Sequence, residues 1–160
     1  MKISAGILLY RKTGPETEYF LVHPGGPFFA KKDLGSWTIP KGQPEGNEGH
    51  LQAAQREFQE ETGLKPIPPF FELGSIKQKG NKIVDAWTFL GDWNPEEGIT
   101  CNTFSLEWPP RSGKMAQFPE VDKASWMRYE EAAEKIIAEQ IPFLDRAREI
   151  FSNQTSINKK

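Results

Sequence analysis

The sequence predicts an α/β fold in which helices cover a mixed β-sheet, and three observations support this prediction. Two segments with strand character, residues 2–12 and 18–24, are joined by the polar turn "TGPET". A strongly helical segment at residues 48–63 separates them from a second pair of strand-like segments. Two further helical segments close the chain. Strands on both sides of a helix, followed by closing helices, indicate an α/β sandwich with a mixed sheet.

The elements follow in order along the chain. Residues 25–36 and 41–47 are expected to be loops around the short apolar piece "WTIP", and Gly63 is placed to end the central helix. Residues 69–80 and 82–93 read as a hairpin around "GN". Prolines in residues 94–103 and 107–122 favour irregular structure there. The closing helices are expected at 129–136 and 140–151, with Pro142 near the first turn of the second.

The composition fits one globular domain and excludes several kinds of site. The chain has 160 residues, 37% of them hydrophobic, so we expect a single domain over 1–152 and a flexible tail over 153–160. Cys101 is the one cysteine and there are two histidines, so neither an internal disulfide nor a metal centre built from these residues is expected. The net charge of −2 and the lack of a long apolar run predict a cytoplasmic protein that binds neither a nucleic acid polymer nor a membrane.

Three glutamates cluster late in the central helical segment, in the stretch "REFQEETGL". At about 100° per residue, Glu60 and Glu61 lie within about 60° of Glu57, so the three carboxylates share one face of the helix. A neighbouring apolar stripe is expected to pack on the sheet; it consists of Leu51, Ala54 and Phe58.

Local physics disfavours this cluster unless it binds a cation. Like charges three and four residues apart repel, and glutamates late in a helix oppose its macrodipole. A solvated charged face is the simpler explanation of the stretch taken alone. A bound divalent cation would reverse the sign of the interaction, because Mg²⁺ and Mn²⁺ prefer oxygen ligands.

Two residues upstream extend the glutamates into a longer pattern. Gly42, five residues, Glu48, seven residues and then "REFQEETGL" give "GQPEGNEGHLQAAQREFQEETGL", which resembles the Nudix box at every specified position. A chance match in a chain of this length has a probability on the order of 10⁻⁷. The resemblance covers residues 42–64 and implies a Nudix hydrolase with an α/β/α sandwich around a mixed sheet.

The resemblance implies a reaction and a cofactor. Nudix enzymes add water across the diphosphate that links a nucleoside to another group, and they use Mg²⁺ or Mn²⁺. Cations that bridge phosphate oxygens neutralise the charge that develops during attack. Arg56 is expected to orient the carboxylates through ion pairs. By resemblance, the metal ligands are Glu57, Glu61, Glu60 and the carbonyl group of Gly42.

The catalytic base and the substrate contacts depend on weaker signals. The base is a box glutamate, Glu60 or Glu57, or a downstream residue, Glu120 in "FPEVD" or Glu107 in "SLEWPP". Lys41, directly before the box, could contact a phosphate as a point charge. The remaining candidates for substrate binding are a cationic loop and aromatic residues that could stack on a base: Arg111, Lys114, Phe29 and Trp37, with Phe28 and Trp87 as further aromatic residues, although Trp87 is expected to pack in the core or hairpin.

The substrate class also follows by resemblance. The segment "WTIPKG" is similar to the approach to the box in dinucleoside polyphosphate and diphosphoinositol polyphosphate hydrolases. The chain as a whole resembles bacterial proteins labelled as predicted nucleoside-triphosphate pyrophosphohydrolases. We therefore expect a small phosphoanhydride substrate, either a dinucleoside polyphosphate or a nucleoside triphosphate. The alternatives are a diphosphoinositol polyphosphate hydrolase, a nucleotide-binding module without catalysis and an acidic interaction domain, and the oligomeric state stays open.

Overall fold

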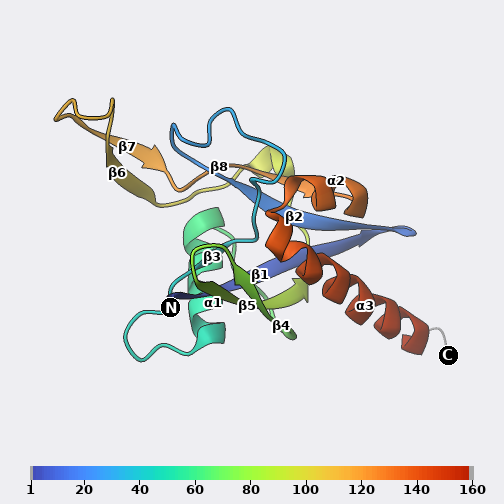
Figure 1. The fold of residues 1–160 in the computed structure, drawn as a ribbon. Helices are drawn as coiled ribbons and strands as arrows, with labels where there is room; N and C mark the ends of the chain where they lie inside the picture. Colours follow the sequence, from blue (N-terminus) through green and yellow to red (C-terminus); the bar gives the residue numbers. More distant parts are fainter. Residues whose placement is uncertain (1, 159–160) are drawn as a thin grey trace.

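The computed structural model describes the backbone of residues 2–158 and the side chains of residues 2–152. At its centre lies a six-stranded sheet in which five strands follow the order β4-β5-β1-β2-β8 and β3 pairs with β1 (Figure 1). Strands β1 and β5 run parallel, whereas the other neighbouring pairs run antiparallel. The predicted α/β fold with a mixed sheet is therefore confirmed.

The bounds of the elements are as follows. The strands are β1 (Lys2–Thr13), β2 (Glu16–Pro24), β3 (Lys41–Gly42), β4 (Phe71–Gln78), β5 (Lys82–Leu90), β6 (Thr103–Glu107), β7 (Met115–Pro119) and β8 (Val121–Met127). The helices are α1 (His50–Thr62), α2 (Tyr129–Lys135) and α3 (Ile141–Asn158), with short 3₁₀ turns at Pro95–Glu97 and Ala138–Gln140.

Helices cover both faces of the sheet, because the central strand β1 is apolar on both sides. Its residues Ala5, Ile7 and Leu9 pack with the apolar side of α1, whereas Leu8 and Tyr10 pack with residues of α2 and α3. Alternate residues of a strand point to opposite faces, so a continuous apolar run is what a doubly covered strand requires. Figure 1 shows the resulting layers, with α1 on one side of the sheet and α2 and α3 on the other.

Local signals in the sequence placed several elements correctly. Helix α1 ends at Gly63, which adopts φ 78° and donates its N–H to the carbonyl oxygen of Gln59 at 2.8 Å, as a left-handed cap requires. The hairpin between β4 and β5 turns at Gly80 and Asn81, both with positive φ. The two closing helices are present, and Pro142 is the second residue of α3.

The structure corrects two of the sequence predictions. Residues 107–122 are irregular only in part: turns and bends occupy 108–113, but Met115–Pro119 form β7, which pairs with β6 in a separate two-stranded sheet. The buried stripe of α1 also differs, since Leu51 is only half-buried while Ala53, which lies on the same side as the carboxylates, is fully buried. The helix is thus rotated so that its acidic edge comes closer to the sheet than expected.

In the predicted tail at 153–160, the backbone of residues 153–158 continues helix α3 up to Asn158, whereas residues 159–160 lie outside the described residues. Within the part of the chain that the structure describes, no helix is both long and apolar enough to cross a membrane.

Candidate active site

The acidic face of α1 lies against the short strand β3, and this contact depends on a glycine. A Cβ atom built on Gly42 would lie 2.0 Å from the carboxyl carbon of Glu57, far inside the van der Waals distance. Only glycine allows the carboxyl group of Glu57 to approach the main chain of β3 so closely. The first residue of the box therefore makes room for one of its glutamates.

Glu61 reaches the same strand one residue earlier. Its Oε2 accepts a hydrogen bond from the main-chain N–H of Lys41 at 3.2 Å, and the residue is only 8% exposed. Burial is the main reason that the pKa of Glu61 rises to about 8; the Lys41 N–H opposes the shift and the Glu57 carboxylate adds to it. Burial also raises the pKa of Glu57, against the effect of Arg56. Two carboxyl groups at this contact therefore resist ionisation unless a cation compensates them.

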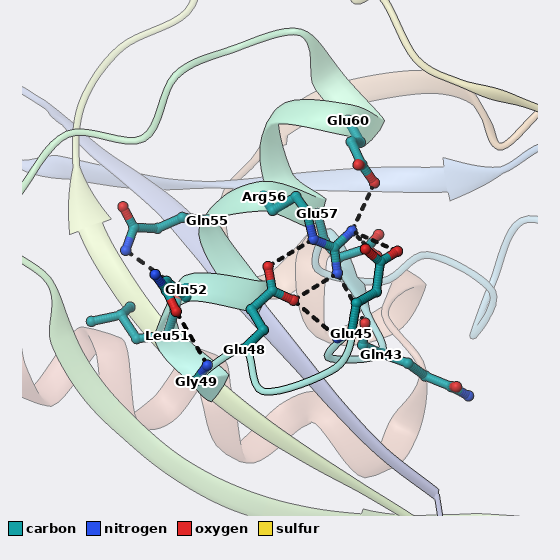
Figure 2. Close-up of polar contacts among 10 residues, drawn as sticks. All are labelled: Gln43, Glu45, Glu48, Gly49, Leu51, Gln52, Gln55, Arg56, Glu57 and Glu60. Carbon is teal, nitrogen blue, oxygen red and sulfur yellow. Dashed lines mark hydrogen bonds and ion pairs between the residues drawn. The ribbon is translucent and has the colours of Figure 1, made fainter.

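Arg56 gathers the surrounding carboxylates on a single guanidinium group (Figure 2). Its Nε and Nη2 donate to the two oxygens of Glu48 at 2.9 and 3.0 Å. Its Nη1 donates to Glu57 at 2.9 Å and to Glu60 at 3.0 Å, while Nη2 also donates to the carbonyl oxygen of Gln43. The planar fork of arginine suits this set of acceptors, which a lysine could not satisfy at once.

Glu48 ties the loop before α1 to the helix. Besides its contact with Arg56, it accepts a hydrogen bond from the N–H of Glu45 at 3.1 Å. The Arg56 guanidinium lowers the pKa of Glu48, so this carboxylate stays ionised and holds the arginine in place. Glu48 thus acts on the cluster through Arg56.

The donor set fits a hard divalent cation that keeps part of its water shell. Among the described residues, no group of three or more acidic, histidine or cysteine side chains is placed to hold a metal ion by itself. Arg56 accounts for part of this openness, because it binds oxygens of both Glu57 and Glu60. Mg²⁺ commonly uses one or two carboxylates together with water and phosphate oxygens. Glu57 and Glu61 beside Gly42 provide such a pair.

The structure separates the two downstream candidates for the base. The N–H of Asn102 donates to the carbonyl oxygen of Glu60 at 3.1 Å, and its own carbonyl oxygen accepts from the N–H of Glu120 at 2.9 Å. Glu120 therefore lies beside the end of α1, where partial burial and the Glu60 carboxylate raise its pKa. Glu107 instead accepts from the N–H of Arg111 at 2.7 Å, at the distal end of the β6–β7 hairpin that projects from the domain in Figure 1.

The candidates for substrate binding divide in the same way. Arg111 and Lys114 lie exposed in the turn of that projecting hairpin, and the structure does not bring them to the α1 carboxylates. Trp37 is only 4% exposed and donates its indole N–H to Asp33 at 2.8 Å. A ring buried in this way cannot stack on a base, which argues against the role expected for Trp37.

Lys41 and Phe29, by contrast, meet at one place. Both line a cavity of about 570 Å³ beside β3. Burial lowers the pKa of the Lys41 ammonium, and the nearby Glu61 carboxylate opposes this shift. Lys41 therefore binds Glu61 through its main-chain N–H and is also one of the residues that line the cavity.

Two residues of the site had no signal in the sequence. Asn102 aligns Glu60 with Glu120 entirely through main-chain hydrogen bonds, which any residue type can make. His23 is fully buried, with Nδ1 2.8 Å from Asp122 and Nε2 2.6 Å from the carbonyl oxygen of Lys32. Both roles depend on contacts between segments far apart in the chain, which no local pattern records.

The fold and the site together define a class: an α/β/α sandwich in which a glycine-containing strand and a carboxylate-rich helix form an oxygen-donor site. The chain matches the NUDIX domain family over residues 1–147. It therefore belongs to the Nudix family, as the box at residues 42–64 indicates.

Solved structures of Nudix proteins have the same fold. A Caenorhabditis elegans Ap4A hydrolase binary complex superposes with a TM-score of 0.65 at 21% identity, covering 94% of this chain and 98% of the other. A MutT/nudix family protein from Listeria innocua gives 0.65 at 19% identity, with 98% and 97% covered. The NUDIX domain of Shewanella oneidensis NrtR, complexed with ADP ribose, gives 0.64 at 17% identity, with 94% and 88% covered. At these identities the likeness shows the fold alone.

A curated relative is more similar in sequence over a shorter stretch. An mRNA-decapping protein of African swine fever virus is 33% identical over 101 residues, which is 59% of this chain. The match spans 37% of the viral protein, so most of that protein has no counterpart in the alignment.

Proposed function

We propose that this chain is a divalent-metal-dependent pyrophosphohydrolase that cleaves a diphosphate bond of a nucleoside polyphosphate by attack of water on phosphorus. The observation that carries the proposal is the seam between α1 and β3. There Glu61 is nearly buried and Glu57 lies against Gly42. Burial of two carboxyl groups with raised pKa values is unfavourable in a purely structural element, and such groups are common at functional sites.

The residues at the contact between α1 and β3 would have different roles. Glu57 and Glu61 would hold Mg²⁺ or Mn²⁺, with the Gly42 carbonyl and Glu60 as further ligands. The bound cation supplies charge neutralisation at the phosphate oxygens and lowers the pKa of a water molecule. Arg56 fixes the orientation of Glu57 and Glu60 through its Nη1. The Lys41 ammonium, near Glu61, attracts a phosphate oxygen as a point charge.

Proton transfer falls to Glu120 or Glu60, since both lie at the same end of α1. A base works best when its pKa lies near the operating pH, and the raised pKa of Glu120 favours it. Glu60 instead shares the Arg56 guanidinium. Glu107 lies at the hairpin tip and we do not assign it the role. The pH dependence of kcat for Glu120→Gln, compared with that for Glu60→Gln, distinguishes the two candidates for the base.

The substrate is a dinucleoside polyphosphate or a nucleoside triphosphate. The C. elegans neighbour is an Ap4A hydrolase, and another neighbour binds ADP ribose, so the fold accommodates adenine nucleotides. Similarity to an mRNA-decapping protein makes a capped RNA end a further substrate to test. All of these share a diphosphate attached to a nucleoside.

One experiment tests the proposal. Purified protein is incubated with Mg²⁺ or Mn²⁺ and a panel of substrates in ¹⁸O-labelled water: diadenosine tetraphosphate, ATP, ADP-ribose, a diphosphoinositol polyphosphate and a capped oligonucleotide. We expect release of a nucleoside phosphate and its loss in Glu57→Gln and Glu61→Gln, while the exposed Gln59→Ala on the same helix retains activity. Full activity in both glutamate variants would exclude the proposed mechanism. If the wild type hydrolyses no substrate, the hydrolase proposal fails and a nucleotide-binding module without catalysis is the alternative.

A further inference from the structure

The β6–β7 hairpin carries the cationic loop that the structure does not bring to the α1 carboxylates, and its tip meets a second exposed segment. The ring of Trp108, at this tip, packs edge-on against the ring of Phe28 in loop 25–36, with 5.5 Å between their centroids. The N–H of Trp108 donates to the carbonyl oxygen of Lys114 at 2.9 Å, which closes the tip. Figure 1 shows the hairpin and the loop after β2 on the same side of the domain. We call residues 25–36 and 107–115 together the projecting surface.

The loop and the hairpin are also packed together at their bases. The N–H of Gly25 donates to the carbonyl oxygen of Glu120 at 3.0 Å, directly after β7. A Cβ atom built on Gly26 would lie 2.9 Å from the ring of Phe104 in β6, so the main chain of the loop lies against the hairpin. The two segments therefore reach a partner as one ordered unit, which limits the entropy lost on binding.

The projecting surface exposes large apolar side chains to solvent. Leu34 is 69% exposed, Met115 is 66% exposed and Phe28 is 60% exposed. In the part of the chain that the structure describes, the large apolar side chains exposed outside this surface lie singly on β1, on β5 and in the loop after α1: Ile3, Leu90 and Ile67. Scattered apolar side chains are normal on a protein surface, whereas a group of them on adjoining segments marks an interaction site.

The same surface carries an excess of positive charge. Its charged residues are four cations and two carboxylates: Lys31, Lys32, Arg111, Lys114, Asp33 and Glu107. All four cationic residues are exposed. The carboxylate of Asp33 pairs instead with the ammonium group of Lys135 in α2 at 3.5 Å. Because the whole chain has a net charge of −2, this end of the molecule is positive on an otherwise acidic protein and favours an anionic partner.

An anionic lipid bilayer fits this combination of groups better than a nucleic acid does. A nucleic acid uses cations together with aromatic rings on which its bases stack, but Leu34 and Met115 have no aromatic face to offer. A bilayer uses both kinds of group, because apolar side chains enter the boundary between headgroups and acyl chains while lysines and arginines bind the anionic headgroups. A protein partner would need pockets of matching shape for these exposed side chains, whereas a fluid bilayer adapts to them.

We propose that the projecting surface docks the protein on anionic membranes, with Phe28, Leu34 and Met115 entering the bilayer interface and the four cationic residues contacting lipid headgroups. Neither signal is sufficient alone, since stable attachment to a bilayer takes an apolar and an electrostatic contribution together. The net charge of the whole chain, from which we expected no membrane binding, averages over this end of the molecule. The proposal does not depend on hydrolysis.

Vesicle binding tests the proposal without any substrate. Purified protein is mixed with vesicles of phosphatidylcholine, alone or with about one third phosphatidylglycerol, and the bound fraction is measured by co-sedimentation. We expect binding to the phosphatidylglycerol vesicles only, and weaker binding at high salt, which screens exposed charges. Serine at both Leu34 and Met115 should weaken binding at least about tenfold. Glutamine at both Lys31 and Lys114 should weaken it by about tenfold or more.

Two exposed residues at the opposite end of the sheet provide matched controls. Leu90 is 44% exposed and pairs with Tyr10, close to the turn between β1 and β2, whereas loop 25–36 follows the other end of β2. Arg128 is exposed and lies at the same end as Leu90, directly after β8. We expect Leu90→Ser and Arg128→Gln to bind vesicles as the wild type does, because neither change touches the projecting surface.

Several results would overturn the proposal. They are no binding to phosphatidylglycerol vesicles, equal binding to both kinds of vesicle, or a loss of binding in the control variants as large as in the surface variants. Anisotropy of a labelled single-stranded oligonucleotide tests the other anionic partner. Oligonucleotide binding that depends on Lys31 and Lys114, in a protein that binds no vesicles, would assign the surface to nucleic acid instead. Since none of these measurements uses turnover, their failure leaves the proposed hydrolase intact, and an inactive hydrolase leaves them valid.

Discussion

Replacing Glu61 by glutamine should make the metal-free protein more stable and the enzyme inactive. The carboxyl group is 8% exposed, and its pKa rises from 4.5 to about 8, chiefly through burial. A carboxyl group with a raised pKa in the folded state binds more protons there than in the unfolded chain, so ionisation destabilises the fold. Glutamine keeps an oxygen for the Lys41 N–H but carries no charge.

The size and pH window of the effect follow from the same pKa values. Stability of the wild type should fall as the pH rises through the interval from 4.5 to about 8, whereas Glu61→Gln should lack this slope. The full shift corresponds to at most about 5 kcal/mol above pH 8. Local relaxation and water entry reduce such penalties, so we expect a gain of about 1–3 kcal/mol at pH 8 and little difference near pH 4.5.

Urea unfolding in EDTA at pH values from 5 to 9 measures this difference. Glu60→Gln on the more exposed side of the helix serves as the control, with a smaller change expected. Excess Mn²⁺ should then reverse the order, because a ligand present at about 1,000 times its Kd stabilises the state that binds it by about 4.1 kcal/mol. A glutamine variant that is no more stable than the wild type at pH 8 in EDTA, or a difference that does not vary with pH, would refute the reasoning.

Three further changes have defined outcomes. Gly42→Ala should displace the Glu57 carboxyl group, since the new Cβ would lie 2.0 Å from its carbon, and should lower kcat and Mn²⁺ affinity at least tenfold. Arg56→Lys keeps the charge but loses the fork of contacts, so urea unfolding should show a loss of about 1–3 kcal/mol. The side chain of His23 contacts both Asp122 and the carbonyl oxygen of Lys32, whereas the amide of His23→Gln can donate to only one of them. Amide hydrogen exchange should therefore become faster in residues 25–36.

Each of these outcomes has a matched control. Gly49→Ala, where the nearest atom lies 3.9 Å from the new Cβ, should leave kcat unchanged. Lys65→Arg, at an exposed position after α1, is the control for replacing one cationic side chain by another and should leave the free energy of unfolding unchanged. Exchange in α3 should be unaffected by the histidine variant, so a general increase across the chain would indicate global destabilisation and contradict the local role of His23.

The sequence predicted the parts of the fold that depend on local physics. The positive φ of Gly63 and the turn at Gly80 follow from the freedom of glycine, and the shared face of Glu57 and Glu61 follows from helical periodicity. Burial of Ala53 in place of Leu51 was not predictable in this way. It depends on how the helix is rotated against the sheet, and only tertiary packing sets that rotation.

Long-range contacts account for the rest of what the sequence did not predict. Strand β7 ends in Pro119 and alternates between exposed and half-buried residues, so it lacks the apolar signal of a core strand and forms only through β6. Glu120 and Glu107 look equivalent in sequence, yet Asn102 brings one to α1 and the hairpin carries the other away. From the sequence alone, Trp37 could stack on a base, but the structure shows that the residue is buried.

The position of Lys41 joins these parts into one site. Its main-chain N–H donates a hydrogen bond to the buried carboxyl group of Glu61, and Lys41 also lines the cavity beside β3. The other residue of this two-residue strand is Gly42, whose lack of a side chain admits the carboxyl group of Glu57. The proposed cation site and the cavity would therefore share two consecutive residues of this short strand, Lys41 and Gly42.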